Sequence, residues 1–193
     1  MCSRDFGRLS DDSAKLKALL DSSKSPQVSE SSFQTILRWG GREISFVEVV
    51  KMFPQDGFSV VAVSDIGKTL YSARIDKTGG GKIISNVLPV SDKFILENLI
   101  AELLVLWDVP DENSRLYVQP DGKWALVSDI GKTVKVYIFD DAGNWLEFRR
   151  ISSCWLKCKE SFEWKQNRVL KLMRVENYDK HYKITREFIS SVP

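Results

Sequence analysis

The chain has 193 residues and a formal net charge of +2, with 43% hydrophobic and 28% charged residues. These values are typical of one globular domain, or of two small ones, and they exclude a disordered or fibrous chain. A net charge this small also gives no support to a polyanionic partner. The charge is uneven, however: residues 149–193 hold eleven Lys and Arg against five Asp and Glu, which hints at an electrostatic partner for that segment.

Cysteine usage and hydropathy indicate where the protein resides. The three cysteines, Cys2, Cys154 and Cys158, do not form the even-numbered set of a disulfide framework. The N-terminal residues lack the apolar stretch of a signal peptide. The longest apolar run, residues 94–107, is interrupted by acidic residues and is shorter than the roughly 20 residues that cross a bilayer. The sequence therefore predicts a cytoplasmic protein with free thiols and no membrane partner.

Residues 1–32 are predicted to form a short helix followed by a flexible linker. Ser10, Asp11 and Asp12 can cap the N-terminus of a modestly amphipathic helix. The following polar, Ser-rich stretch, residues 21–32, buries too little apolar surface to offset the cost of ordering its backbone.

Residues 33–193 are predicted to form a single globular domain, with 45–107 and 108–193 as candidate pseudo-repeat halves. Ser45 and Glu48 have the spacing of a capping box before an apolar run that ends at Pro54, which predicts a short helix. A second helix is predicted from Ser91 to about Trp107. Its apolar side chains cover more than half of its circumference, so we expect it to be the central core helix.

Strand patterns dominate the rest of the chain. The predicted strands include residues 58–76, 115–119, 123–128, 133–139, 145–151, 155–159, 162–166, 169–175 and 181–189, with a hairpin turn at 177–180. The predicted fold class is therefore α+β: mainly antiparallel β-hairpins that form an open sheet or partial barrel packed on one apolar central helix, with a duplicated hairpin unit.

The duplicated unit is marked by the heptapeptide Val-Ser-Asp-Ile-Gly-Lys-Thr, which occurs at Val63–Thr69 and again at Val127–Thr133. Each copy predicts a strand, a tight turn in which Gly67 or Gly131 has a positive φ, and a return strand. Both copies are therefore interpreted as the same scaffold hairpin, used twice.

Two more specific interpretations of the repeat have less support in the sequence. A phosphate-binding loop needs an earlier glycine, which Ala62 and Leu126 replace, and it needs a helix after the Gly-Lys-Thr. Residues 119–140 resemble part of a blade of the WD-repeat kind, which would imply a propeller of about four to eight blades. Only two such units occur, so we carry over no binding residues from that resemblance.

Metal and catalytic signatures are missing. Cys154 and Cys158 together with His181, the only histidine, offer at most three soft ligands, whereas structural zinc usually has four. Buried free thiols are the simpler interpretation, and we expect no metal and no cofactor. No nucleophile motif occurs and no pair of carboxylates stands out, so no catalytic residue is predicted and an enzyme is not favoured.

The C-terminal segment interleaves aromatic and cationic residues. On one face of a sheet, aromatic rings can stack on bases while Lys and Arg contact phosphates. The candidate nucleic-acid-binding residues are Trp155, Lys157, Lys159, Trp164, Lys165 and Arg168. Ordinary alternation of buried and solvated side chains explains the same pattern, and the interspersed glutamates favour that explanation.

Three classes of function follow. The favoured one is a non-catalytic protein-binding module, such as an immunity, inhibitor or adaptor protein of a bacterium or phage, whose partner is another protein. The first alternative is a nucleic-acid-binding β-domain that uses the basic aromatic segment. The second is an enzyme whose carboxylate site the sequence does not reveal. The sequence specifies neither the partner nor the oligomeric state.

Overall fold

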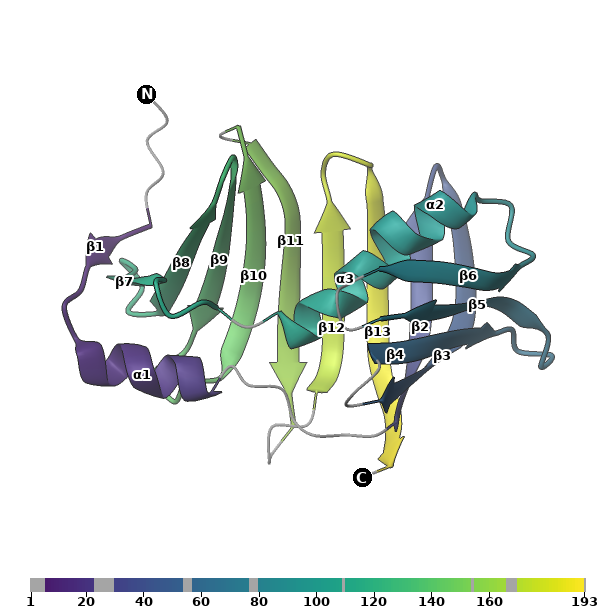
Figure 1. Ribbon diagram of the computed structural model, residues 1–193, viewed down its shortest axis with the longest axis horizontal. Helices are drawn as coiled ribbons and strands as arrows, with labels where there is room; N and C mark the ends of the chain where they lie inside the picture. The colour runs from purple at the N-terminus through teal and green to yellow at the C-terminus, as the bar shows by residue number, and fades with distance from the viewer. Residues whose placement is uncertain are drawn as a thin grey trace. The chain divides into compact units, whose positions relative to one another are not determined.

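The computed structural model shows a chain that consists mostly of antiparallel β-strands (Figure 1). It describes residues 6–22, 30–53, 57–76, 80–108, 110–153, 155–165 and 170–192. The chain divides into two compact units, which we describe separately. The first unit comprises Met1–Ser25 and Trp107–Lys183, and the second comprises Pro26–Leu106 and Ile184–Pro193.

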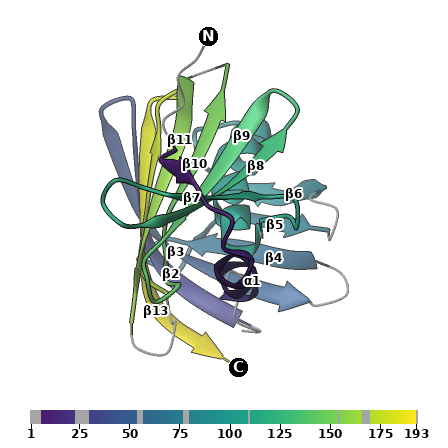
Figure 2. The same ribbon diagram turned by 90° about the vertical axis from the view of Figure 1, so that its left-hand side faces the viewer.

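The first unit is an up-and-down antiparallel sheet with one helix. Its elements are β1 (Arg8–Leu9), α1 (Ser13–Ser22), β7 (Arg115–Val118), β8 (Trp124–Ile130), β9 (Thr133–Phe139), β10 (Trp145–Ser152), β11 (Trp155–Trp164) and β12 (Leu170–Asn177). The strand order is β1-β7-β8-β9-β10-β11-β12. Figure 2 shows β8 and β9 tilted from β10 and β11, which is the twist that sheets of L-residues adopt.

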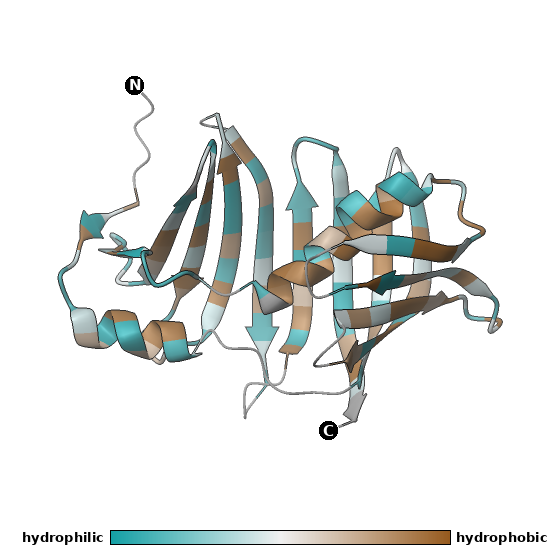
Figure 3. Ribbon diagram, viewed as in Figure 1, coloured by the Kyte–Doolittle hydropathy of each residue, from teal (hydrophilic) through white to brown (hydrophobic). Residues whose placement is uncertain are grey.

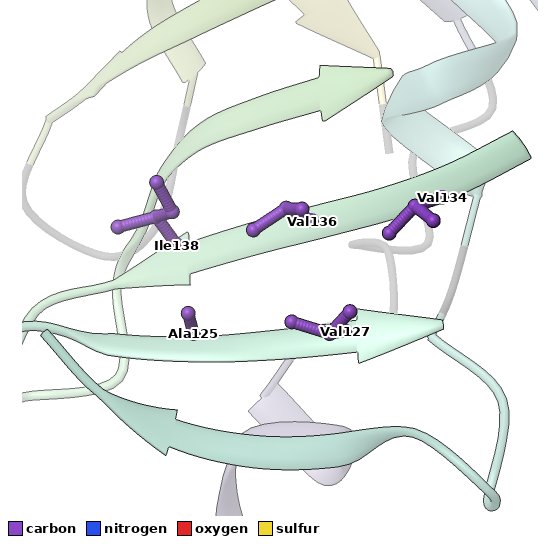
Figure 4. Close-up of a cluster of buried hydrophobic side chains, with 5 residues drawn as sticks. All are labelled: Ala125, Val127, Val134, Val136 and Ile138. Atoms are coloured by element: carbon purple, nitrogen blue, oxygen red, sulfur yellow. The ribbon is translucent and has the colours of Figure 1, made fainter. Parts of the chain in front are cut away.

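Strand β9 is buried on both of its faces. On one face Val134, Val136 and Ile138 pack with Ala125 and Val127 of β8 (Figure 4). On the other face Tyr137 and Phe139 are buried, and Tyr137 contacts the rings of Trp145 and Phe148. Because side chains alternate along a strand, a run with apolar residues at consecutive positions is suited to burial on two sides.

The second unit contains a six-stranded sheet and a helical segment. Its elements are β2 (Glu30–Trp39), β3 (Arg42–Phe53), β4 (Gly57–Val63), β5 (Thr69–Ile75), β6 (Gly81–Asn86), α2 (Asp92–Phe94), the π-helical η1 (Ile95–Ile100), α3 (Ala101–Leu104) and β13 (Tyr182–Val192), which begins two residues before the unit boundary. The 3-10 turn η2 (Val105–Trp107) spans the other boundary. The strand order is β13-β2-β3-β4-β5-β6.

One face of this second sheet is buried with a strict period of two. Its buried side chains include Phe46, Glu48 and Val50 on β3, Phe58, Val60 and Ala62 on β4, and Tyr71, Ala73 and Ile75 on β5. The helical segment contributes Ile95, Leu99, Ile100 and Leu103 to the core. In Figure 3 this segment begins hydrophilic at α2 and becomes hydrophobic toward α3.

The expected α+β class is wrong. The helix predicted from Ser45 is strand β3, because alternate residues of this segment are buried and the capping-box spacing is coincidental. The predicted core helix does begin at Ser91, whose Oγ accepts a hydrogen bond from the Phe94 N–H (3.1 Å). It is not one α-helix, however, but a series of short α-, π- and 3-10-helical pieces.

Each copy of the heptapeptide lies in a hairpin whose glycine has the predicted positive φ, 79° at Gly67 and 61° at Gly131, but the two hairpins are not the same unit. In the first copy Val63 pairs with Thr69 across a loop, in which Ser64 Oγ accepts from the Lys68 N–H (3.1 Å). In the second copy β8 continues to Ile130, which pairs with Thr133 across a two-residue turn. In both copies the outer neighbouring strand pairs only as far as the first residue of the heptapeptide, Val63 or Val127, so the two turns differ although their sequences and strand neighbours correspond.

The structure describes only part of the N-terminal segment, residues 1–32, for which a helix and a linker are predicted. Helix α1 lies where the sequence predicts a short helix, and Leu19 anchors it in the core. Lys15 lies over the Trp124 ring and donates to the Asp141 carbonyl (2.9 Å). Within the predicted linker, residues 23–29 are outside the described part of the chain.

Candidate functional site

The most unusual feature of the second unit is a buried ion pair between β3 and β13. Glu48 Oε2 lies 2.7 Å from Arg186 Nε, and neither side chain has any solvent exposure. Two charges removed from water are tolerated only if they are paired closely and their remaining hydrogen-bonding atoms are well supplied. The surrounding strands supply those partners.

The Glu48 carboxylate receives hydrogen bonds from three strands. Thr35 Oγ1 on β2 donates to Oε2 (2.6 Å), and the Tyr71 hydroxyl on β5 donates to Oε1. Burial and the neighbouring carboxylate raise the pKa of Tyr71 well above its ordinary value, so the hydroxyl keeps its proton and remains a donor. A carboxylate this fully occupied by donors is suited to holding strands together rather than to proton transfer.

Arg186 also connects the sheet to the helical segment. Its Nη2 atom donates to the Leu99 carbonyl (2.8 Å), and Leu99 lies in the π-helical η1. Short π-helical stretches inside helices are frequent at functional sites. We call this contact the Arg186–Leu99 latch; Asn98 and Glu102 are further buried polar residues of the helical segment.

Apolar contacts surround the latch. The Trp39 and Phe94 rings pack with centroids 5.5 Å apart at the start of the helical segment, and Phe46 packs edge-on against Tyr71 at 6.1 Å. Near the opposite edge of the sheet, a Cβ atom on Gly81 would lie 2.8 Å from Leu96 Cδ2, so η1 closely approaches β6. The helical segment thus covers an apolar sheet face and is fixed to it by one buried cation.

The sequence did not reveal this cluster. Glu48 and Arg186 are 138 positions apart, and each looks locally like an ordinary charge on a strand. The available signal is weak: Glu48 occupies an inward position in the apolar alternation of β3, where an acidic residue needs a buried partner.

The predicted nucleic-acid-binding residues do not form one surface. Trp155, Lys157 and Lys159 lie near the start of β11, whereas Trp164 ends that strand and Lys165 follows it. Lys157 pairs with Asp179 (2.8 Å) and Lys159 with Glu147 (3.0 Å), and Trp164 Nε1 donates to the Trp145 carbonyl. Arg168 is outside the described residues. The structure therefore brings only the first three together.

Of the soft ligand candidates, the structure describes two. The Cys158 thiol is buried and donates to Glu160 Oε1 (3.9 Å), and His181 is exposed in the turn before β13, with a φ of 54°. Cys154 is outside the described residues.

Comparison with known proteins gives the fold. No family model matches the chain, and no curated protein matches it significantly. Among solved structures, a LolA superfamily protein from Nitrosomonas europaea aligns with a TM-score of 0.56 and 8% identity over 92% of this chain and 93% of that one. The fold is similar to that of the LolA superfamily. A domain from Vibrio parahaemolyticus, assigned as an outer membrane lipoprotein-sorting protein, aligns with a TM-score of 0.52 and 14% identity over 92% of this chain and 90% of that one.

The LolA-like fold overturns several expectations. The class is a mostly antiparallel LolA-like sheet, not an α+β hairpin fold packed on a helix. The favoured function, an immunity, inhibitor or adaptor module, and the nucleic-acid-binding alternative are both wrong, because the fold is shared with lipoprotein-sorting proteins. The cytoplasmic location is contradicted by the same similarity to an outer membrane lipoprotein-sorting domain.

The expectation about partners holds in its coarser form. One solved structure with a similar fold is a lipoprotein-sorting domain, which is compatible with a protein partner. In the described ranges, the helices are all too short or too polar to cross a membrane.

Proposed function

We propose that this protein is a carrier that binds a lipid, or the acylated end of a lipoprotein, on the apolar sheet face of the second unit. The observation that carries the proposal is the helical segment Asp92–Leu104, which lies over that face and is fixed to it by the Arg186–Leu99 latch. Similarity of fold to a lipoprotein-sorting domain supports the same class of ligand.

The covered face has suitable chemistry for acyl chains. Each methylene group that leaves water contributes about 0.8 kcal/mol, so a long acyl chain gains on the order of 10 kcal/mol in an apolar site. The helical segment occupies the face in this structure, because Ile95, Leu99 and Leu103 are all buried. A ligand would therefore exchange its contacts for those of the helical segment.

The helical segment has features of an element that can move. It consists of short α- and π-helical pieces, and short helices depend on tertiary contacts for their stability. Releasing it would break the latch, a hydrogen bond to a charged group worth about 1.5–3 kcal/mol. Release would also expose Ile95, Leu99 and Leu103, so the acyl chain has to replace their apolar contacts as well as offset the loss of the latch. A carrier of this kind would work in the cell envelope.

A disulfide lock tests the proposal. In a chain with Cys2 and Cys154 replaced by serine, Gly81→Cys with Leu96→Cys is designed to join β6 to η1. A Cβ on Gly81 would lie 3.9 Å from Leu96 Cγ, the position that a cysteine sulfur at residue 96 would take, and Ile75 Cδ1, 2.7 Å from that Cβ, would have to shift. We expect the reduced variant to bind a fluorescent diacylated lipopeptide, and the oxidised variant to bind at least ten times more weakly.

The controls separate locking from damage. Each single cysteine variant should bind equally well with and without oxidant, and a non-acylated peptide of the same sequence should not bind. Equal binding by the oxidised and reduced double variants would show that the helical segment does not need to move, and would overturn the proposal.

A further inference from the structure

Three hairpin turns gather at one edge of the first unit. In an antiparallel meander every second turn lies at the same end of the sheet, so the β8–β9, β10–β11 and β12–β13 turns share one edge (Figure 1). Ser152 Oγ donates to the Lys132 carbonyl (3.4 Å), which links the first two turns. The Tyr178 N–H donates to the Lys157 carbonyl (3.0 Å), which links the next two.

Large apolar side chains are exposed along this edge. Trp155 is 74% exposed, Tyr178 43% and Leu156 36%. A bulge in the β10–β11 pairing brings Ser152 opposite Trp155, so the tryptophan ring has no apolar neighbour across the ladder. Single exposed apolar residues are common, but three at the tips of two adjoining hairpins are a concentration of apolar surface typical of an interaction site, with Trp155 and Leu156 on opposite faces of the strand.

Lysines flank these apolar side chains. Lys132 and Lys180 are exposed on the outer two turns, and no ion pair of either side chain is found among the described residues. Two further lysines lie at the same edge in ion pairs: Lys157 with Asp179 (2.8 Å) and Lys183 with Glu176 (2.7 Å). We define the hairpin-tip ridge as Lys132, Trp155, Leu156, Lys157, Tyr178 and Lys180.

We propose that the hairpin-tip ridge docks the first unit on an anionic membrane surface. Trp and Tyr favour the headgroup region, where an apolar ring and a polar edge are both accommodated. Lysine stems can lie along the acyl boundary while their ammonium groups contact lipid phosphates.

The ridge fits a lipid surface better than a protein partner. A stable protein interface uses about 20–30 residues from each side, whereas the ridge offers three apolar side chains at the ends of two hairpins. Headgroups rearrange around narrow tips, and a protein surface does not. The expectation of no membrane partner rested on the lack of a spanning segment, which surface docking does not require.

Vesicle flotation tests the proposal. We expect the wild-type chain to float with phosphatidylcholine vesicles that contain about 30% phosphatidylglycerol, and to bind pure phosphatidylcholine much more weakly. Trp155→Ser should lower binding to anionic vesicles at least tenfold. Lys132→Glu with Lys180→Glu should lower it at least 25-fold, since each lysine near an anionic surface contributes about a fivefold effect before its charge is reversed.

Matched controls lie in the second unit. Ile66→Ser removes an apolar side chain that is 90% exposed, and Lys51→Glu with Lys82→Glu reverses two exposed charges; neither should change binding. Equal losses in the controls, or no binding of the wild-type chain to anionic vesicles, would overturn the proposal and leave a protein partner as the occupant of the ridge.

The ridge and the proposed carrier function can fail separately. The oxidised Gly81→Cys/Leu96→Cys variant should still float with anionic vesicles, because the lock lies in the second unit. Trp155→Ser should bind the acylated peptide as the wild-type chain does. Loss of vesicle binding with retained lipopeptide binding would refute the ridge alone, and the converse would refute the carrier alone.

Discussion

Glu48 and Arg186 form an ion pair between strands that are 138 positions apart in the chain, and neither side chain contacts solvent. The pair unites β2, β3, β5 and β13 through one carboxylate, and it reaches the helical segment through Arg186. A buried ion pair adds little stability compared with apolar packing. The Glu48–Arg186 pair therefore mainly specifies how the sheet and the helical segment fit together.

Breaking the pair from one side should destabilise the protein strongly. We expect Arg186→Met to lower the free energy of unfolding by about 3–5 kcal/mol, because the Glu48 charge is left buried without its counter-ion. The double variant Glu48→Gln with Arg186→Met should recover more than half of that loss, since the glutamine oxygen can accept from one of the two hydroxyls, Tyr71 or Thr35, and its amide group can donate to the other. Urea unfolding of Glu48→Gln, Arg186→Met and the double variant tests this. A double variant whose loss of unfolding free energy equals the sum of the two single losses would contradict this account.

Tyr71 should give the protein an alkaline limit to its stability. Its pKa is raised in the folded chain by burial and by Glu48, so the unfolded chain loses the hydroxyl proton first as the pH rises. The stabilisation is fully present below about pH 10, the pKa of an unfolded tyrosine, and is lost above it. Tyr71→Phe should therefore show a shallower fall of unfolding free energy between about pH 10 and 11.5. An unchanged slope would show that Tyr71 does not contribute.

Local periodicity was sufficient to place much of the sheet of the first unit. The predicted strand at residues 133–139 is confirmed as β9, and that at 145–151 as β10 with one further residue. Alternating or continuous apolar runs between turn residues carry this information within a few neighbouring positions. The Ser91 cap is confirmed for the same reason, since a cap is a contact between residues three apart.

Features that depend on distant neighbours were not predictable. The segment from Ser45 satisfies a helix-start pattern, and only its pairing with β2 and β4 makes it a strand. The identical heptapeptides form turns of different register, so the seven residues alone do not determine the turn. Arg186, the partner of Glu48, is equally remote in the sequence, so the buried pair could not be predicted. The local pattern of aromatic and basic residues instead led to candidate residues on β11 and directly after it.

Glycine substitutions should separate backbone strain from steric conflict. Gly67 and Gly131 have φ values of 79° and 61°, and a Cβ at either position would meet nothing within 4 Å. Alanine there should cost about 1 kcal/mol, from φ alone. At Gly57 (φ 111°) a Cβ would lie 2.0 Å from the Ile75 carbonyl oxygen, so Gly57→Ala should cost several times more. Thermal unfolding ranks the three variants, and similar losses at Gly57 and Gly67 would refute the steric argument.

The two copies of the repeat should respond differently to the same substitution. Ser128 is buried and shares a hydrogen bond of 2.6 Å with Ser114 on the segment before β7, which is also buried. Ser128→Ala leaves the Ser114 hydroxyl without this partner and should cost about 1–3 kcal/mol. Its counterpart Ser64 accepts from the Lys68 N–H in an exposed turn, where water can replace it.

Ser64→Ala should therefore cost about 0.5 kcal/mol or less, the range of exposed surface substitutions. Urea unfolding of the two variants provides the comparison, with Ser114→Ala/Ser128→Ala as the control. If the unpaired hydroxyl is the cause, removing both serines should be less costly than removing Ser128 alone. Equal losses for Ser64→Ala and Ser128→Ala would mean that the different hydrogen-bond partners of the two serines have no energetic consequence.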